Sequence, residues 1–347
     1  MLTNNLSSEI FNAISEGILL LDDELAILDT NSAADNLLSW AYPLKGKNLN
    51  DIFFSQELNM AALGIIKDGV RRKLQILSYH GHTGNAAFTM GKGREKNYRI
   101  RLTRIEEGYI LLTLTDATRM ERLATVRQDF VANVSHELKT PLTAIIGFSE
   151  TLSEENLSTD EMHRFADIIL NNSKRMQRTI QDLLLLTSLD RAEMLPSMEK
   201  VSIRKLLNDV EATTEFMANE KNILVSYSAS DEMLLCNESL IFQALINLVI
   251  NAINYSPSDS CISVTAVEKD NNIVFSVTDQ GCGIAEEDLA RIFERFYRVD
   301  KARSRASGGT GLGLSIVRHI AILHEGTIQV DSELKKGSVF KLSIPKS

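Results

Sequence analysis

Two stretches of helical periodicity in the middle of the chain limit its fold more than any other feature. Apolar residues recur there close to every seventh position. The first stripe comprises Met120, Leu123, Phe130, Val134, Leu138, Ile145 and Leu152, and the second, beyond a loop near 154–157, comprises Met162, Phe165, Ile169, Met176, Ile180, Leu183 and Thr187. One such antiparallel hairpin cannot bury both faces well, whereas two hairpins form a four-helix bundle. Each buried large side chain contributes about 1.5–3 kcal/mol, so the pattern predicts a homodimer.

Short polar signals mark where these helices begin. Thr118 with Glu121, and Ser158 with Glu161, have the Ser/Thr-x-x-Glu spacing of a capping box. In a capping box, each of the two side chains accepts a hydrogen bond from the other residue's backbone N–H. We therefore expect the helices to start at these two points.

The regions on either side of the hairpin mix strands and helices. Before it, strands are predicted at 17–22, 25–29, 98–105 and 108–115, with a helix at 32–40. After it, helices are predicted at 202–221 and 238–255, and strands at 223–228, 261–268, 273–279, 327–331 and 338–344. Since 347 residues exceed one ordinary core, we expect a multidomain α+β protein. Its predicted domains are an α/β region at 1–116, the helical hairpin at 117–195 and an α/β sandwich at 196–347.

Composition excludes several classes of protein. A net charge of −9 argues against a nucleic-acid surface. The three cysteines, Cys236, Cys261 and Cys282, lack metal-ligand spacing, and their odd number does not suggest a disulfide framework. No apolar run approaches the ~18–20 residues that span a bilayer, and no signal peptide is visible. We expect a cytoplasmic protein, or the cytoplasmic part of a membrane protein, with no membrane segment in this chain and no direct nucleic-acid partner.

The run at 135–143 places a histidine beside a carboxylate within the first helix. Neutral imidazole is a nucleophile, and the Glu137 carboxylate can accept a ring proton as His136 attacks phosphorus. Thr140 lies one turn further on the same face, where its hydroxyl could hold a water in line with a phosphoryl group. Pro141 removes a backbone donor and clashes with a preceding carbonyl, which is expected to loosen the helix. A lone His-Glu pair is usually a solvated surface pair, but the whole run favours chemistry.

Two motifs near the C-terminus have the pattern of a nucleotide site. Asn247 and Asn251 share one helix face, where amide oxygens suit Mg²⁺ already bound to phosphates. A cap or a helix–helix hydrogen bond is an equal alternative for these amides. Asp279 ends an apolar strand, and Gly281 and Gly283 follow it. These glycines permit close approach of a flat ligand while the carboxylate accepts from an exocyclic amine. A simple turn is the alternative.

A glycine-rich run at 308–314 leads into a helix that extends to about His324. Backbone N–H groups at a helix N-terminus suit phosphates. The run matches neither the Walker nor the Rossmann pattern. Between it and Asp279 lie Phe293 and Phe296, which we interpret as lid packing, and Arg298, whose guanidinium has the fork geometry for a phosphate.

In their order and spacing, these motifs resemble those of the sensor histidine kinases of two-component systems. The resemblance covers roughly residues 119–345. The segments 135–143, 247–255, 279–283, 293–298 and 309–313 resemble the phosphoacceptor, asparagine, first glycine, phenylalanine and second glycine boxes. The sequence around 299–305 is most similar to the phosphate-regulon and cell-wall sensor subgroup.

The resemblance implies a C-terminal ATP-binding domain of the histidine kinase and chaperone ATPase type, with ATP and Mg²⁺ as cofactors. It implies that His136 takes the γ-phosphoryl group with Glu137 as base, and that Thr140 serves a phosphatase reaction. The phosphoryl group would pass to an aspartate on a response regulator receiver domain. The nucleotide residues that it implies are Asn247, Asn251, Asn254, Tyr255, Asp279, Gly281, Gly283, Phe293, Phe296, Arg298, Gly309, Thr310, Gly311, Leu312 and Gly313, with Asn251 at the metal.

One position departs from the family pattern. Asn254 stands where the family often has a lysine that supports the phosphates. An amide has no charge to supply, so Lys301, Arg303 or Arg305 in the lid would have to replace it. Otherwise ATP affinity or rate should be reduced.

Residues 9–116 resemble a PAS sensory domain. No cysteine precedes Cys236, which excludes flavin–cysteine photochemistry there. His80 and His82 are interpreted as solvated rather than as haem or metal ligands. Two other functions remain open for the whole chain: an ATPase of the chaperone or mismatch-repair class, which would hydrolyse ATP without forming a phosphoprotein, and a non-catalytic dimeric scaffold.

Overall fold

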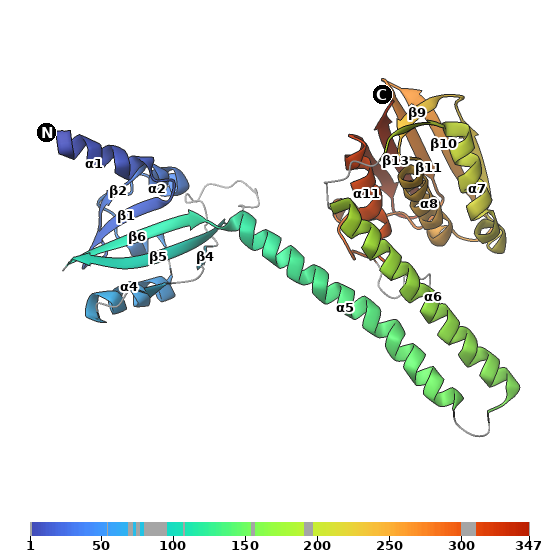
Figure 1. Cartoon of the computed structure of the whole chain (residues 1–347), viewed down its shortest axis with the longest axis horizontal. Coiled ribbons are helices and arrows are strands. Elements are labelled where there is room, and N and C mark those ends of the chain that lie inside the picture. The colour runs from blue at the N-terminus through green and yellow to red at the C-terminus, as the bar shows by residue number, and fades with distance from the viewer. Residues whose placement is uncertain are drawn as a thin grey trace. The chain divides into compact units, whose positions relative to one another are not determined.

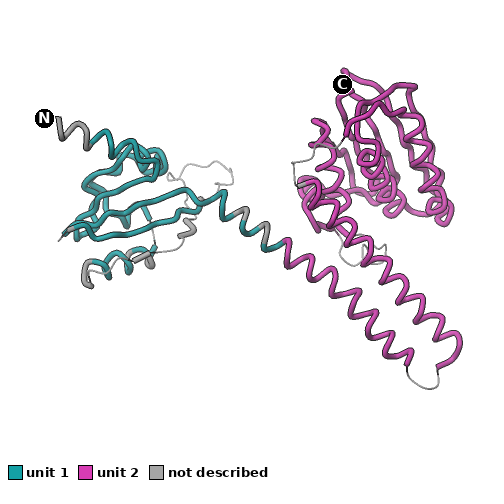
Figure 2. The backbone as a smooth tube through the Cα atoms, in the orientation of Figure 1, with its two compact units in different colours: residues 1–129 teal, residues 130–347 magenta. Residues whose placement is uncertain are grey.

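A computed structural model of the chain describes residues 2–53, 55–68, 72–73, 77–79, 96–106, 108–153, 157–190, 197–299 and 310–346 (Figure 1). They form two compact units, residues 1–129 and 130–347 (Figure 2). The boundary lies inside a long helix. The second unit holds both the helical hairpin and the C-terminal α/β region, and the three-domain division remains a prediction.

The first unit is an antiparallel sheet with helices around it. Its strands are β1 (Gly17–Asp22), β2 (Ile27–Thr30), β3 (Arg72–Lys73), β4 (Leu77–Tyr79), β5 (Lys96–Glu106) and β6 (Tyr109–Asp116), in the order β2-β1-β6-β5-β3 with β4 also on β5. Its helices are α1 (Leu2–Ala13), α2 (Ser32–Leu37), the 3₁₀ turn η1 (Ser39–Ala41), α3 (Leu49–Ile52) and α4 (Gln56–Asp68).

The predicted elements of this unit are present with one change. β1 and β2 pair antiparallel, as the hairpin prediction requires. The predicted alternation of β5 is confirmed, because Tyr98, Ile100 and Leu102 are buried on one face. The helix predicted at 32–40 instead ends at Leu37, since the fully buried Leu38 has φ −108° and ψ 29°, outside helical geometry.

Two long helices form the hairpin, α5 (Thr118–Leu152) and α6 (Thr159–Asp190). α5 continues through Pro141 without interruption. At the start of α6 the predicted capping box is confirmed: the Ser158 N–H donates to Glu161 Oε2 (2.9 Å), and the Glu161 N–H donates to Ser158 Oγ (3.3 Å).

The capping box predicted at the start of α5 is wrong. Thr118 is already the first helical residue, and its hydroxyl accepts from the backbone N–H of Asn97 on β5 (2.9 Å). The Asp116 carboxylate accepts the Thr118 N–H in its place (2.9 Å). The Thr118 hydroxyl that the capping box would have used is therefore already hydrogen-bonded to the neighbouring strand β5.

The C-terminal region is a two-layer α/β sandwich. Its sheet contains β8 (Leu224–Ala229), β10 (Cys261–Lys269), β11 (Asn272–Thr278), β12 (Thr327–Glu333) and β13 (Gly337–Pro345), in the order β12-β13-β11-β10-β8. β8 and β10 are parallel and the other pairs antiparallel. The helices α7 (Ile203–Glu220), α8 (Glu238–Tyr255) and α11 (Gly313–Leu323) pack against it, and α9 (Glu286–Leu289) is short.

The core of the sandwich lies between these helices and one face of the sheet. Ile262, Val264 and Ala266 of β10 alternate with more exposed residues, as do Ile273 and Phe275 of β11. All five predicted strands are confirmed. A second, two-stranded sheet, β7 (Glu199–Ser202) with β9 (Met233–Cys236), was not predicted.

All three cysteines are free thiols. Cys236 is buried, and burial raises its pKa to about 12. Across the described ranges, no helix has both the length and the apolar character to cross a membrane.

His324 makes the sandwich sensitive to acid. Its Nε2 accepts from the Asn237 N–H (3.1 Å) at the start of α8, and its Nδ1–H donates to the Ile320 carbonyl (2.8 Å), an assignment that follows from these two partners. Burial lowers the pKa of this imidazole. In the unfolded chain this imidazole has its ordinary pKa of about 6.5, so as the pH falls it is protonated there before it is protonated in the folded protein. The free energy of unfolding therefore decreases as the pH falls through that value.

We therefore expect the free energy of unfolding to decline from pH 7 to pH 5, and this decline to be smaller in His324→Gln. Urea unfolding at several pH values measures it. His163→Gln, which alters an exposed histidine on α6, is the matched control. Identical pH slopes in the two variants would refute the assignment.

Candidate active site

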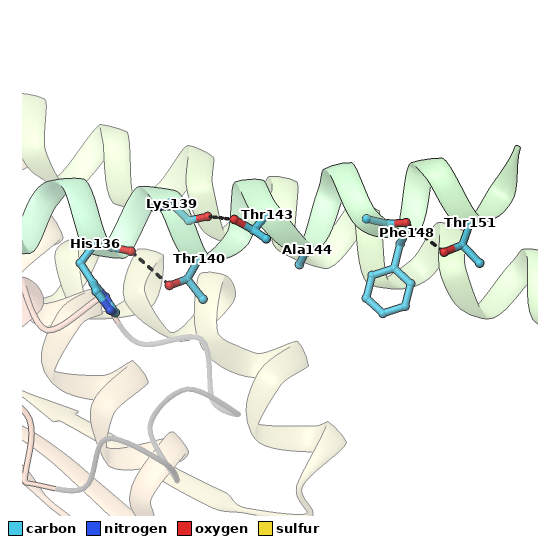
Figure 3. Close-up of a pocket in the computed structure, with 8 residues that line it drawn as sticks. His136, Lys139, Thr140, Thr143, Ala144, Phe148 and Thr151 are labelled. Atoms are coloured by element: carbon cyan, nitrogen blue, oxygen red, sulfur yellow. Dashed lines mark hydrogen bonds between the residues drawn. The ribbon is translucent and has the colours of Figure 1, made fainter.

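His136 lies exposed on an open groove along α5. The groove is lined by His136, Lys139, Thr140, Thr143, Ala144, Gly147, Phe148 and Thr151. Figure 3 shows the His136 ring and the Phe148 ring projecting to the same side of the helix. The Thr140 hydroxyl lies one turn after His136 and donates to the His136 carbonyl (3.1 Å). The predicted sharing of one face by His136 and Thr140 is therefore confirmed, and the imidazole is open to a partner.

Glu137 is turned away from this groove, as its offset of about 100° around the helix requires. Its side chain is only 18% exposed. Oε2 accepts from Arg175 Nη2 of α6 at 2.9 Å and lies 3.9 Å from Arg298 Nη1. The carboxylate predicted as base is thus held between two guanidinium groups, one on the hairpin and one on the α/β region.

Asp279 lies buried where β11 ends. Its Oδ1 accepts from the backbone N–H of Gly281 (2.7 Å) and of Ser338 (3.2 Å). Burial raises the pKa of this carboxyl, while the two backbone hydrogen bonds act in the opposite direction. With Oδ1 fixed by the backbone, Oδ2 is the oxygen available to a ligand.

The turn after Asp279 leaves no space for side chains. A Cβ on Gly281 would lie 2.7 Å from Asp279 Oδ1 and 2.8 Å from the Tyr255 carbonyl oxygen. Gly283 has φ +68°, and a Cβ there would lie 2.0 Å from the Glu333 carbonyl oxygen. Only glycine fits at either position. These contacts are with the protein's own backbone, so packing of the turn itself requires the two glycines, and the close approach of a flat ligand remains a prediction.

Asn247 joins the asparagine box to the second glycine box. Its Nδ2 donates to the carbonyl of Gly313, the first residue of α11 (3.4 Å), and its Oδ1 accepts from Gln243 Nε2 (3.3 Å). Asn251 is half-buried one turn further along α8, and its role at Mg²⁺ remains a prediction. The Asn254 carbonyl accepts from Lys221 Nζ (3.0 Å).

The phenylalanine box packs onto the second glycine box. The Phe296 N–H donates to the Gly311 carbonyl (2.8 Å), and both residues have positive φ, +63° and +73°. A Cβ on Gly311 would lie 3.0 Å from Phe296 Cα and 3.3 Å from Arg298 Cγ. Phe293 packs against the core of the sandwich. Leu312 is fully buried, and its N–H donates to the Thr310 hydroxyl (3.2 Å).

Some predicted residues lie outside the described part of the chain. They are Gly309, the three lid cations Lys301, Arg303 and Arg305, and the pair His80 and His82. Among the described nucleotide residues, three groups lie together: Asn247 with Gly313, Gly281 with Asp279 and Tyr255, and Gly311 with Phe296 and Arg298.

Sequence reasoning missed the residues that join the hairpin to the α/β region. The Phe130 ring lies 5.8 Å from the Phe296 ring and 5.5 Å from the Arg295 guanidinium carbon. Arg175 pairs with Glu137, and Asp182 accepts from the Thr310 hydroxyl (2.8 Å). A carboxylate directly before the apolar run 183–186 is the one signal that could have singled out Asp182.

Two family models match the chain in the order expected from these motifs. Residues 126–192 match the His Kinase A (phospho-acceptor) domain. Residues 236–347 match the histidine kinase-, DNA gyrase B- and HSP90-like ATPase. The first match contains His136, and the second contains the asparagine, phenylalanine and glycine boxes.

Relatives and solved structures agree with these matches. The sensor-like histidine kinase SenX3 of Mycolicibacterium smegmatis is 40% identical over 246 residues, covering 71% of this chain and 64% of that protein. The sensor protein SrrB of Staphylococcus aureus is 29% identical over 353 residues, covering 99% of this chain and 56% of that protein. The chain thus matches less than two thirds of the length of these relatives.

Among solved structures, histidine kinase ThkA in complex with response regulator protein TrrA has the same fold, with a TM-score of 0.54 at 22% identity. That match covers 98% of each chain. The chain belongs to the sensor histidine kinases of two-component systems.

Proposed function

We propose that this chain phosphorylates His136 from Mg-ATP and passes the phosphoryl group to an aspartate of a response regulator. The observation that carries the proposal is the exposed imidazole of His136 in the same unit as the buried Asp279 carboxylate and its glycine turn. The first supplies a nucleophile and the second a fitted place for a nucleotide base. Each lies inside the family match that corresponds to its role.

The proposed transfer needs little covalent chemistry from the protein. An imidazole nitrogen of His136 forms a bond to the γ-phosphorus of ATP, the bond to the leaving ADP oxygen breaks, and the other ring nitrogen passes its proton to the Glu137 carboxylate, the proposed base. Catalysis is then mostly positioning and neutralisation of charge. Mg²⁺, which Asn251 would help to hold, supplies the neutralisation when bound.

Glu137 and Arg298 face each other in this structure, although the resemblance assigns them to the base and the γ-phosphate. In the proposed transfer Glu137 would act on the His136 ring and Arg298 would contact the γ-phosphate, so the two side chains would no longer face each other. We infer that the α/β region must shift along the hairpin before transfer, separating Arg298 from Glu137.

The response regulator is the proposed acceptor, and the groove around His136 is its proposed docking face. The groove is open and carries both polar and apolar side chains, including Lys139, Thr143 and Phe148. ThkA, which shares the fold, was solved with a response regulator. The Thr140 hydroxyl, one turn from His136, supports the additional proposal that the chain dephosphorylates its regulator.

A homodimer is proposed because the described parts of the hairpin carry uncovered apolar side chains. The exposed large apolar side chains along the two helices include Met120, Val131, Leu142, Ile146, Met162, Leu170, Ile180 and Leu184, several of them about half exposed or more. A second hairpin would bury these side chains and complete a four-helix bundle. The first unit is proposed to be a PAS-type sensor, supported by its antiparallel sheet and its direct continuation from β6 into α5.

One experiment tests the function in three steps. The full chain is incubated with Mg-ATP carrying a labelled γ-phosphate, and we expect a protein-bound label that is labile to acid and stable to alkali. A receiver domain is then added, and the label should move to its aspartate. Continued incubation should release inorganic phosphate from the receiver. Steady hydrolysis without phosphoprotein would indicate a chaperone-type ATPase instead, and absence of ATP binding would indicate a scaffold.

A further inference from the structure

The C-terminal end of α6 is built into the α/β region. Leu186 of α6 is fully buried in the same core cluster as residues of α8 and α11, and Leu183 and Leu185 pack against that cluster. α6 and α11 are in direct contact. The hairpin helix therefore forms one wall of the sandwich along this seam, and a polar group there needs a partner.

Asp182 is the acidic residue at this seam, one turn before Leu186. Its Oδ2 accepts from the Thr310 hydroxyl at 2.8 Å. The same hydroxyl accepts the N–H of Leu312 (3.2 Å), the N-cap residue directly before α11. A chain of two hydrogen bonds thus runs from the hairpin helix, through Thr310, to the start of α11.

The start of α11 favours negative charge. Leu312 has no side-chain cap to offer the first N–H groups of the helix, and the helix dipole is positive at this end. Burial raises the pKa of Asp182, against the effect of the Thr310 hydrogen bond. When ionised, the Asp182 carboxylate is an anion held one hydroxyl group from the backbone that the proposed function assigns to the phosphates of ATP.

Two anions near one helix end compete with each other. At an effective dielectric constant near 20, repulsion between two unit charges several ångströms apart exceeds thermal energy, and the nearby Arg178 cation offsets part of it. We propose that Asp182 is a positioning residue that stands in for phosphate at Thr310, and that nucleotide phosphates displace it, loosening the seam between α6 and α11. This proposal rests on the proposed function, because it requires phosphates to bind at the second glycine box.

The substitution Asp182→Asn removes the negative charge of the side chain while nearly keeping its size and shape. An asparagine can still accept from the Thr310 hydroxyl, but it does not repel phosphate. We expect the Kd for Mg-ADP to fall about fivefold, and KM for ATP in autophosphorylation to fall with it while kcat stays within about twofold. A residue that only supported the fold would lower kcat or stability instead. Titration calorimetry and initial rates on the full chain measure these values.

Matched variants show whether the effect passes through Thr310. Asp167→Asn removes an exposed carboxylate elsewhere on α6 and should leave the Kd unchanged. In a Thr310→Val background, which lacks the bridging hydroxyl, Asp182→Asn should no longer tighten binding, whereas Thr310→Ser should preserve the effect. Circular dichroism checks that each variant is folded.

Three results would overturn the proposal: no gain in affinity from Asp182→Asn, an equal gain from Asp167→Asn, or an equal gain in the Thr310→Val background. An equal gain in the Thr310→Val background would mean that the charge of Asp182 affects nucleotide binding directly, without the hydrogen bond to the Thr310 hydroxyl. A wild-type chain that does not bind Mg-ADP would contradict the proposed function first and this proposal with it. A wild-type chain that binds Mg-ADP while Asp182→Asn changes nothing would contradict this proposal alone.

Discussion

Replacing His136 by glutamine should abolish labelling of the chain by Mg-ATP, with a loss of at least about a thousandfold. Glutamine is similar in reach and polarity, but its amide nitrogen has no lone pair available for attack on phosphorus. His136 is exposed on α5 and forms no part of the glycine turn beside Asp279. The substitution should therefore remove chemistry and leave nucleotide binding unchanged.

Labelling with radioactive ATP measures the loss, and two further measurements make it specific. The Kd for Mg-ADP should match that of the wild type within about twofold, and the free energy of unfolding should change by less than about 0.5 kcal/mol, because the side chain is at the surface. His163→Gln, at an exposed position on α6, should label normally. Label that persists in His136→Gln would show that another residue is the acceptor.

Local patterns in the sequence predicted most of the elements that position this site. The near-heptad stripes correspond to α5 and α6, and the predicted helix 238–255 coincides with α8. These predictions succeed because periodic burial repeats several times within each element. β7 and β9 were missed because each has four residues, too few for alternation to be distinguished from a loop.

The contacts that join the elements could not be predicted in the same way. Glu137 and Arg175 are separated by 38 residues, and Asp182 and Thr310 by 128. No local spacing relates such pairs, since only the packing of α6 on α11 brings the second pair together. The failed capping box at Thr118 has the same cause: its hydroxyl is used by Asn97 of an adjacent strand, which no helix-start rule includes.

Asp279→Asn should change which purine the site prefers. In the wild type, Oδ1 is occupied by the N–H groups of Gly281 and Ser338, which leaves Oδ2 as the proposed acceptor for the exocyclic amine of adenine. Asparagine can keep its carbonyl oxygen on the two backbone N–H groups. Its Nδ2 then stands where Oδ2 was, and a donor meets the donor of adenine.

We expect the affinity for Mg-ADP to fall about a hundredfold, which is typical when a buried donor loses its acceptor. Inosine diphosphate carries a carbonyl oxygen at the position of the adenine amine, so Nδ2 can donate to it. The variant should therefore bind Mg-IDP more tightly than Mg-ADP, whereas the wild type should show the opposite order. Titration calorimetry with both nucleotides measures this reversal.

The reversal separates recognition of the base from support of the fold. If Asp279 only held the backbone N–H groups of Gly281 and Ser338 in place, its replacement would weaken the binding of both nucleotides equally. It would also lower the midpoint temperature of thermal unfolding. The control is Asp331→Asn, which removes an exposed carboxylate paired with Lys341 on the sheet surface (2.7 Å) and should alter neither affinity. A preference for Mg-ADP retained in Asp279→Asn would mean that another group reads adenine. A reversed preference assigns that role to Oδ2 of Asp279, because the substitution exchanges an acceptor for a donor at that atom.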